Sequence, residues 1–364
     1  MDAKITKIED LGWDLFFEAN RVKLELDGFL VARVISEHKG AYKVRSADGE
    51  YLGKITGKQI WKAFSKEDYP VVGDWVAITK LEEDRAVVHN ILPRKTVMKR
   101  KQSGKNEIQM IAANIDVAFV VESVDRDFNL NRLERYFAMA NEGGIKPAII
   151  LNKIDLISKE MLTSKIAQIK IRFKDIDIIP ASVLTKAGLY DLEAYIKKGQ
   201  TYCFLGSSGV GKSSLINELI GESKIKTGSI GLRSGRGKHT TTAREMHFLV
   251  QGGIVIDNPG MREVGMADTH SGIDNFFDEI TSLAKKCKFF DCTHIHEPGC
   301  EVLSALKAGI LDKDKYGNYI NLKKEAEFYE MNKLEKKEKD RQFGKFIKKA
   351  KKDFKSYRHK NYGD

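Results

Sequence analysis

The chain has 364 residues, of which 42% are hydrophobic and 31% charged, and its formal net charge is +11. One hydrophobic core usually stops growing near about 250–300 residues, so this length predicts two or three domains. No apolar run is long enough to span a bilayer, and the acidic N-terminus is unlike a signal peptide. We therefore expect a cytoplasmic protein without a membrane partner.

Residues 1–95 are predicted to form an N-terminal extension and a barrel of the oligonucleotide-binding (OB) kind. Between residues 26 and 92, apolar and polar positions alternate over the runs FLVARVI, AYKVRSA, YLGKITG, DWVAITK and AVVHNIL. This alternation is typical of half-buried strands, and five short strands fit a small closed barrel. A β-sandwich or a barrel without a ligand would give the same pattern. The basic segment that follows predicts a linker at 96–112 within reach of RNA.

In residues 113–270, predicted strands and helices alternate along the chain. Buried strands are predicted at 115–124, 147–152, 176–180 and 201–206, and helices at 130–144, 158–173 and 189–198. This alternation predicts an α/β fold with a doubly wound parallel sheet, whose ligands bind beyond the carboxyl ends of the strands.

The stretch LGSSGVGKSSL contains a P-loop pattern between an apolar run and a helix. Glycines allow successive backbone N–H groups to surround phosphates at the helix N-terminus. Lys212 is expected to reach the β- and γ-phosphates, and Ser213 to ligate Mg²⁺. The predicted phosphate-binding residues are Gly206, Ser207, Ser208, Gly209, Val210, Gly211, Lys212, Ser213 and Ser214. This loop alone does not distinguish ATP from GTP.

The motif NKID, which follows the strand PAIIL, favours GTP. Asp155 can accept hydrogen bonds from guanine N1–H and its exocyclic amine, a pair of donors that adenine lacks, while Asn152 and Lys153 brace the ring and the P-loop. After the next strand, Ser182 and Val183 are placed for a backbone N–H to meet guanine O6. A charged turn after a strand is the alternative interpretation.

Two switch segments follow the P-loop. Asp257 ends the predicted strand GIVID at the edge of the sheet, where it is expected to bind Mg²⁺ through water. Gly260 is expected to contact the γ-phosphate. The intervening segment 224–244 is rich in Gly and basic residues and is predicted to order only with nucleotide, Mg²⁺ or a partner. One of Thr240, Thr241 and Thr242 is expected to be the second Mg²⁺ ligand. The order of base-reading loop, P-loop, threonine switch and DxxG is a circular permutation of the usual GTPase.

The C-terminal part is predicted to be a helical zinc-binding domain at 271–332 and a basic tail at 333–364. Cys287, Cys292, His294 and Cys300 offer three thiolates and one imidazole, which suits one tetrahedral structural Zn²⁺. Free thiols or a redox pair are the alternative. The tail holds thirteen Lys or Arg against five Asp or Glu, a net +8, with interleaved aromatics. It predicts nucleic-acid contact, and a solvated lysine-rich helix is the alternative.

The run VVGDWV at 71–76, the permuted order of NKID, GSSGVGKSS, GKHTTT and DNPG, and the cysteine cluster resemble the ribosome small-subunit-dependent GTPase A (RsgA) family over essentially the whole chain. The resemblance implies a GTPase that matures the 30S subunit, binds its 16S rRNA near the decoding centre and leaves after subunit-stimulated hydrolysis. It also implies His294 rather than the neighbouring His296 as zinc ligand. In that family a histidine, here His239, replaces the usual water-orienting glutamine; a phosphate-contacting or purely structural role for it stays open.

We expect a monomer that uses GTP/GDP, Mg²⁺ and Zn²⁺. A GTP-gated RNA-binding module, or a GTPase acting on another RNA or partner, would use the same parts. DNPG stands where the family usually has DTPG or DSPG, and ASVLTKAGL where Ser-Ala followed by Gly-x-Gly is commoner. Neither departure removes a charged ligand.

Overall fold

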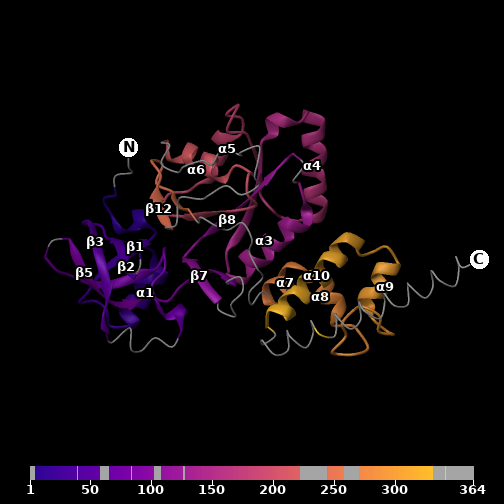
Figure 1. Ribbon diagram of the computed structural model, residues 1–364, viewed down its shortest axis with the longest axis horizontal. Coiled ribbons are helices and arrows are strands. Elements are labelled where there is room, and N and C mark those ends of the chain that lie inside the picture. Colours follow the sequence, from indigo (N-terminus) through magenta and orange to yellow (C-terminus); the bar gives the residue numbers. More distant parts are fainter. Residues whose placement is uncertain are drawn as a thin grey trace, which may run out of the picture.

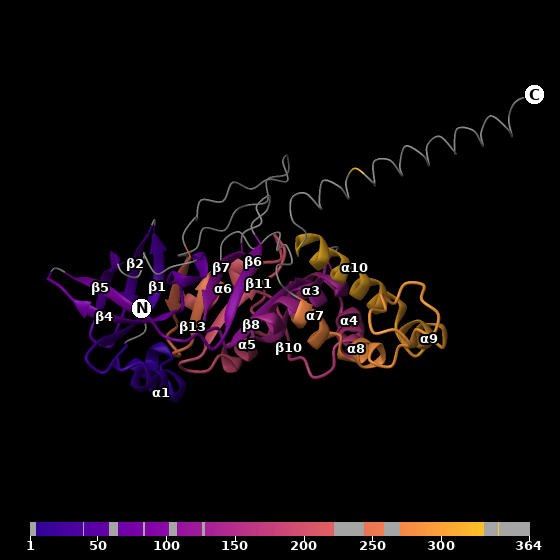
Figure 2. The ribbon, with the colours of Figure 1, turned by 90° about the horizontal axis from the view of Figure 1, so that it is seen from below.

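The computed structural model describes residues 5–38, 40–57, 65–82, 84–101, 108–125, 128–221, 244–257, 270–330 and 341. Three parts lie in a row: a barrel, a central sheet flanked by helices, and a helical domain at the other end (Figures 1 and 2). Within the described ranges, no helix combines the length and the apolar character needed to cross a membrane.

The N-terminal part is the predicted five-stranded barrel. Its strands are β1 (Leu30–His38), β2 (Ala41–Arg45), β3 (Glu50–Ile55), β4 (Trp75–Lys80) and β5 (Arg85–Ile91). They pair in the order β1-β2-β3-β5-β4, and β4 also pairs with β1, which closes the barrel. The short helices η1 (Ile8–Leu11) and α1 (Leu15–Lys23) precede it, and η2 (Lys66–Asp68) precedes β4. Trp13 and Phe17 pack on Trp75 and so attach this extension to the barrel.

The segment predicted as a linker is instead a hairpin of β6 (Val97–Lys101) and β7 (Ile108–Ala113). Met98, Ile111 and Ala112 are buried in the core that also holds β8 residues. The polar residues of this segment gave the linker prediction, but β7 is buried continuously from Met110 to Ala113, and Met98 of β6 is buried with it.

The central part is the predicted doubly wound sheet. Its order is β10 (Ile178–Ala181), β9 (Lys146–Asn152), β8 (Val117–Ser123), β11 (Thr201–Leu205), β13 (Ile254–Asp257) and β12 (Glu245–Phe248). All pairs are parallel except β12 with β13. Residues of α3 (Leu130–Glu142) and α4 (Lys159–Arg172) share one core with the sheet, and residues of α5 (Leu189–Tyr195) and α6 (Lys212–Ile220) share a second. The fold class predicted from sequence is confirmed.

Strand β12 joins the barrel to the central sheet, because Ser36 of β1 pairs with Glu245. The result is one continuous 11-stranded sheet. Beside this joint, the buried Arg33 side chain donates to the carbonyl oxygens of Leu11 at 2.5 Å, Gly73 at 3.2 Å and Asn114 at 2.9 Å. Burial lowers the pKa of Arg33 to about 10. Each donated bond satisfies a polar group that burial would otherwise leave unpaired.

Replacing Gly73 by Ala is expected to destabilise the junction. Gly73 has φ +96°, and a Cβ atom there would lie 2.0 Å from the Ala113 carbonyl oxygen. We expect the free energy of unfolding to fall by roughly 3 kcal/mol or more, measured by denaturant titration. The control is Gly28→Ala, since Gly28 has no atom within 4 Å of its Cβ position. Equal stability of the two variants would contradict the assigned packing.

The C-terminal domain contains α7 (His270–Phe276), α8 (Asp278–Ala284), α9 (Glu301–Lys307) and α10 (Lys313–Glu330) around a core of their own. It docks on α3. Arg135 forms two hydrogen bonds with Glu325, at 2.6 and 3.1 Å, and the backbone N–H of Gly272 donates to Glu142 at 2.6 Å. The predicted basic tail lies outside the described residues, apart from Arg341.

Candidate nucleotide and metal sites

The predicted nucleotide-binding motifs meet at one edge of the central sheet. Asn152 ends β9, the P-loop follows β11, Asp257 ends β13, and Ser182 follows β10. Because these strands are parallel, their carboxyl ends lie at the same edge, which is where ligands bind in open α/β sheets.

The P-loop is shaped by three glycines with positive φ, Gly206 at 139°, Gly209 at 83° and Gly211 at 99°. A Cβ at Gly206 would lie 2.3 Å from the carbonyl oxygen of Val121, so the loop can approach β8 only without a side chain. Helix α6 then begins at Lys212, whose Nζ donates to the carbonyl oxygens of Gly206 at 2.7 Å and Ser207 at 2.6 Å. The loop thus places a lysine and a helix N-terminus together, as an anion site requires.

Asn152 connects the base-reading motif to the P-loop. Its Nδ2 donates to the Val210 carbonyl oxygen at 2.7 Å, and its Oδ1 is buried with no hydrogen-bond partner. A Cβ at Gly211 would lie 2.2 Å from Nδ2, so this contact requires glycine there. The next residue, Lys153, adopts φ 63°, and its Nζ lies 3.1 Å from Asp125. The two motifs, 58 residues apart, therefore form one structure.

Asp155 lies against the loop that follows β10. The Ser182 hydroxyl donates to its Oδ1 at 2.5 Å, and the backbone N–H of Thr185 donates to the same hydroxyl at 3.2 Å. The Ser182 backbone N–H donates to the Ala187 carbonyl oxygen at 2.9 Å, so of the two predicted donors to a base, only that of Val183 stays a candidate. Asp155 itself is exposed and open to a ligand.

Asp257 is half-buried at the end of β13, in register with Glu245 of β12. Burial raises the pKa of the Asp257 carboxyl, the Lys212 ammonium opposes this change, and the Glu245 carboxylate adds to it. The structure therefore brings Asp257 close to the P-loop lysine. His239, Thr241, Thr242 and Gly260, which the sequence also assigned to this site, lie outside the described residues.

The cysteine cluster is assembled as the sequence predicted. Ligand atoms of Cys287, Cys292, His294 and Cys300 all lie within 4.8 Å of one another. The Cys287 and Cys300 sulfurs are 3.8 Å apart, and His294 Nδ1 lies 3.6 and 3.5 Å from them. In a tetrahedron with Zn–S near 2.3 Å and Zn–N near 2.05 Å, the corresponding edges are about 3.8 and 3.6 Å. These residues therefore fit a zinc ion.

The comparisons with known proteins agree with this geometry. A family model described as RsgA GTPase matches residues 91–267. The chain is 40% identical to small ribosomal subunit biogenesis GTPase RsgA 1 of Bacteroides thetaiotaomicron, over 88% of this chain and 90% of the relative. This chain belongs to the RsgA family of GTPases.

Other relatives support the assignment to RsgA. The chain is 42% identical to small ribosomal subunit biogenesis GTPase RsgA of Methanosarcina acetivorans, over 82% of this chain and 80% of the relative. The crystal structure of YjeQ from Thermotoga maritima aligns with a TM-score of 0.59 at 25% identity, covering 80% and 96% of the two chains. That of YloQ, a circularly permuted GTPase, aligns with the same TM-score at 22% identity, covering 84% and 97%, and so supports the fold alone.

As a member of the RsgA family, the chain is a GTP hydrolase, and the permuted order predicted from the motifs is confirmed. A second family model, for ABC transporters, matches residues 189–355. That range includes the P-loop, a motif that many nucleotide-binding folds share.

A buried glutamate, which the motifs did not predict, ties the start of α3 to the nucleotide-binding edge of the sheet in this RsgA chain. Glu122, fully buried in β8, accepts hydrogen bonds from the Asn129 backbone N–H at 2.9 Å and from Arg132 at 2.6 and 3.3 Å. The sequence does show a glutamate inside an otherwise apolar strand. Because glutamate is almost never fully buried without a partner, this position indicates a buried polar contact.

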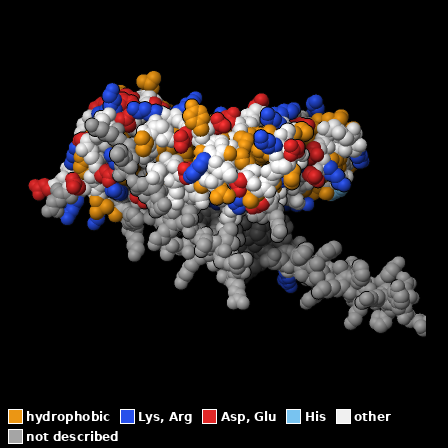
Figure 3. All heavy atoms as spheres, turned by 90° about the horizontal axis from the view of Figure 1, so that it is seen from above, with side chains coloured by type: hydrophobic (Ala, Val, Ile, Leu, Met, Phe, Trp, Pro, Cys, Tyr) orange, Lys and Arg blue, Asp and Glu red, His pale blue; other side chains and the backbone are white. Residues whose placement is uncertain are grey.

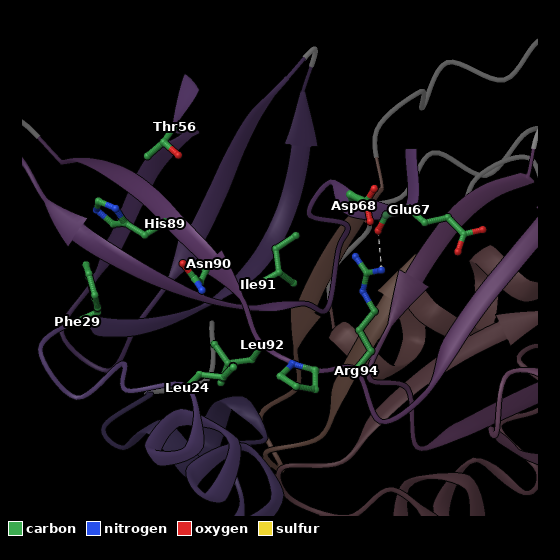
Figure 4. A pocket seen from close by; sticks show the side chains of 11 residues that line it. Leu24, Phe29, Thr56, Glu67, Asp68, His89, Asn90, Ile91, Leu92 and Arg94 are labelled. Atoms are coloured by element: carbon green, nitrogen blue, oxygen red, sulfur yellow. Dashed lines mark hydrogen bonds between the residues drawn. The ribbon is translucent and has the colours of Figure 1, made fainter. Parts of the chain in front are cut away.

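A cavity of about 860 Å³ lies on the barrel, and no residue of the P-loop lines it (Figure 4). Phe29 and His89 stand together at one end, with ring centroids 4.8 Å apart. At the other end Arg94 is held by Asp74 at 2.8 Å and by the carbonyl oxygens of Glu67 at 2.8 Å and Tyr69 at 3.0 Å. No predicted motif lines this cavity.

Proposed function

We propose that the chain binds GTP at the edge formed by the NKID motif and the P-loop, and acts in late maturation of the small ribosomal subunit. The observation that carries the proposal is the hydrogen bond from Asn152 to the Val210 carbonyl oxygen, which joins the NKID motif to the P-loop. The Ser182 hydroxyl positions Asp155 of the same motif. The names of the curated relatives, small ribosomal subunit biogenesis GTPases, support the cellular task. We also propose that the chain is a monomer and works in the cytoplasm.

In this proposal the guanine base lies over Asn152 and Lys153 and donates two hydrogen bonds to Asp155. The backbone N–H of Val183 meets guanine O6. The phosphates lie in the loop from Gly206 to Ser214, and Lys212 moves its Nζ from the loop carbonyls to the β- and γ-phosphates, exchanging neutral acceptors for charged ones.

Magnesium would be held by Ser213, by Asp257 through water, and by Thr241 or Thr242. When bound, it neutralises the charge that develops on the phosphates during hydrolysis. The half-buried Asp257 carboxyl has a raised pKa, so a cation beside it favours its ionised form. Zinc is proposed to be structural, one ion per chain, because Cys287, Cys292, His294 and Cys300 leave no open position for substrate.

The 16S rRNA is proposed to contact the barrel and the basic tail. On strands β2 to β4 and the adjoining turn, the basic side chains outnumber the acidic ones: Lys43, Arg45, Lys54 and Lys80 against Asp48 and Glu50. Glu50 pairs with Lys43 and Arg45, and Asp48 pairs with Lys80, so the excess of basic groups is two. On the face of the molecule seen in Figure 3, acidic and basic side chains are likewise interspersed. Phosphate neutralisation by the basic strands supplies affinity without sequence readout.

The direct test of the partner is co-sedimentation with purified 30S subunits in a non-hydrolysable GTP analogue, at moderate salt. We expect the chain to sediment with 30S subunits in the GTP analogue and much less in GDP. Absence of co-sedimentation would exclude the proposed partner and leave a GTPase acting on another RNA or protein.

His239→Ala is expected to retain GTP affinity and to lose the stimulated turnover. A residue that orients or activates water typically contributes about 10²–10⁴-fold to the rate, so the subunit-stimulated rate should fall by that order. His239→Gln is the matched variant, since glutamine can also orient water, and it should recover part of the rate. Stimulated turnover that is unchanged in His239→Ala would remove this residue from the mechanism.

A further inference from the structure

The loop between the zinc ligands Cys287 and Cys292 presents an aromatic side chain that the fold does not use. Phe290 has an exposed fraction of 103%, and its neighbour Phe289 is 42% exposed. Phe290 belongs to none of the described hydrophobic clusters, including that of the C-terminal domain. Burial of a Phe side chain stabilises a fold, whereas full exposure gains nothing, and so Phe290 is free to bury its ring against a partner.

Both ends of the loop that carries Phe290 lie at the cysteine cluster. Cys287 and Cys292 lie at its two ends, and their sulfurs belong to the same cluster. The neighbouring loop is closed from within by the Glu297 carboxylate, which accepts from the backbone N–H groups of Thr293 at 3.0 Å, Ile295 at 3.1 Å and His296 at 3.1 Å. A preorganised surface loses little conformational entropy when it binds.

Three exposed lysines precede the aromatic pair closely in the chain. Lys285, Lys286 and Lys288 are all exposed, and none forms an ion pair with another residue in the described part of the chain. The Lys288 ammonium lies 5.6 Å from the centroid of the Phe289 ring. Asp291 is the exposed acid beside them, while the Glu297 carboxylate is occupied by the loop. An aromatic face beside unpaired lysines is typical of surfaces that stack unpaired bases and neutralise the adjacent phosphates.

We propose that residues 285–292, the zinc-loop tip, bind an unpaired RNA base by stacking it on Phe290, with Lys285, Lys286 and Lys288 facing the flanking phosphates. The inference rests on the proposed function only for the source of the RNA, the rRNA of the small subunit. An apolar pocket on a protein would fit the exposed ring but would leave the three cations without acidic partners.

The test compares the full-length parent with Phe290→Ala, Phe290→Leu and Phe290→Trp. The probe is a short fluorescein-labelled single-stranded RNA of mixed sequence. We expect Phe290→Ala and Phe290→Leu to weaken binding about 5- to 100-fold, because neither offers an aromatic face, and Phe290→Trp to retain it. The indole of Phe290→Trp should also be quenched on binding. Unchanged binding by Phe290→Ala, full binding by Phe290→Leu, or no added quenching in Phe290→Trp would each overturn base stacking.

A parallel measurement with 30S subunits separates this inference from the proposed function. If the parent sediments with 30S subunits while Phe290→Ala binds the RNA as the parent does, the inference alone fails. If the parent does not sediment with 30S subunits but Phe290→Ala loses affinity for the RNA, the proposed partner fails and the stacking surface stands. Zinc content and unstimulated GTP hydrolysis of every variant should equal those of the parent, which confirms that folding is intact.

Discussion

Asp155→Asn is expected to lower the affinity for GTP by about 10²–10⁴-fold, because guanine would lose two hydrogen bonds to a charged acceptor, each worth about 1.5–3 kcal/mol. The same variant should bind xanthosine triphosphate (XTP) more tightly than GTP. Xanthine carries a carbonyl where guanine has its amine, and the Asn amide can donate to that carbonyl while its oxygen accepts from N1–H. The measurement is nucleotide affinity by fluorescence titration with labelled GTP and competing XTP.

The matched control is Asp175→Asn, which makes the same chemical change at an exposed loop position outside the site. Asp175 has φ 58°, a conformation that Asn tolerates well, so the change should not strain the backbone. We expect this control to bind GTP as the parent does. An Asp155→Asn variant that retains GTP affinity would show that the carboxylate does not read the base.

His294→Ala is expected to abolish stoichiometric zinc binding and to unfold the loops of the C-terminal domain. Zinc binding supplies about 10–16 kcal/mol to small zinc sites, and a missing ligand removes much of it. The His294 carbonyl oxygen also accepts a hydrogen bond from Tyr316 of α10 at 2.7 Å, so the disturbance should reach that helix. Zinc per chain by elemental analysis and proteolytic cleavage after Lys285–Lys288 are the measurements.

His296→Ala is the control for this second experiment, because His296 is exposed and lies two residues from the ligand. It should bind one zinc per chain and resist protease as the parent does. Loss of zinc from His296→Ala with retention in His294→Ala would reverse the ligand assignment.

Much of the fold followed from local pattern. The strands of the barrel and of the parallel sheet, and helices such as that capped by Ser158, were predicted because their buried positions recur at strand or helix spacing. Strand β12 was not, because EMHF is only four residues long and follows a Gly-rich segment. Its role depends on Ser36, more than 200 residues earlier in the chain. Such a contact leaves no local signal in either segment.

The sites also include features that a local sequence pattern predicts and features that it does not. The P-loop glycines, NKID and the cysteine spacing each fix several ligand atoms within a short stretch, so the sequence alone located them. The docking of the C-terminal domain did not show in the sequence. Glu134 is fully buried between Arg172, at 2.7 and 3.0 Å, and Asn318, yet its place on an amphipathic helix resembles that of a solvated charge. Only the tertiary structure shows that this buried carboxylate is hydrogen-bonded by Arg172 of α4 and Asn318 of α10.

The proposed function requires that this RsgA chain couple guanine nucleotide hydrolysis to the small ribosomal subunit. This coupling is measured as the rate of GTP hydrolysis with and without purified 30S subunits, with 50S subunits as the control. We predict a slow rate alone, a rate at least about tenfold higher with 30S subunits, and no comparable increase with 50S subunits. A rate that 30S subunits leave unchanged would exclude this coupling.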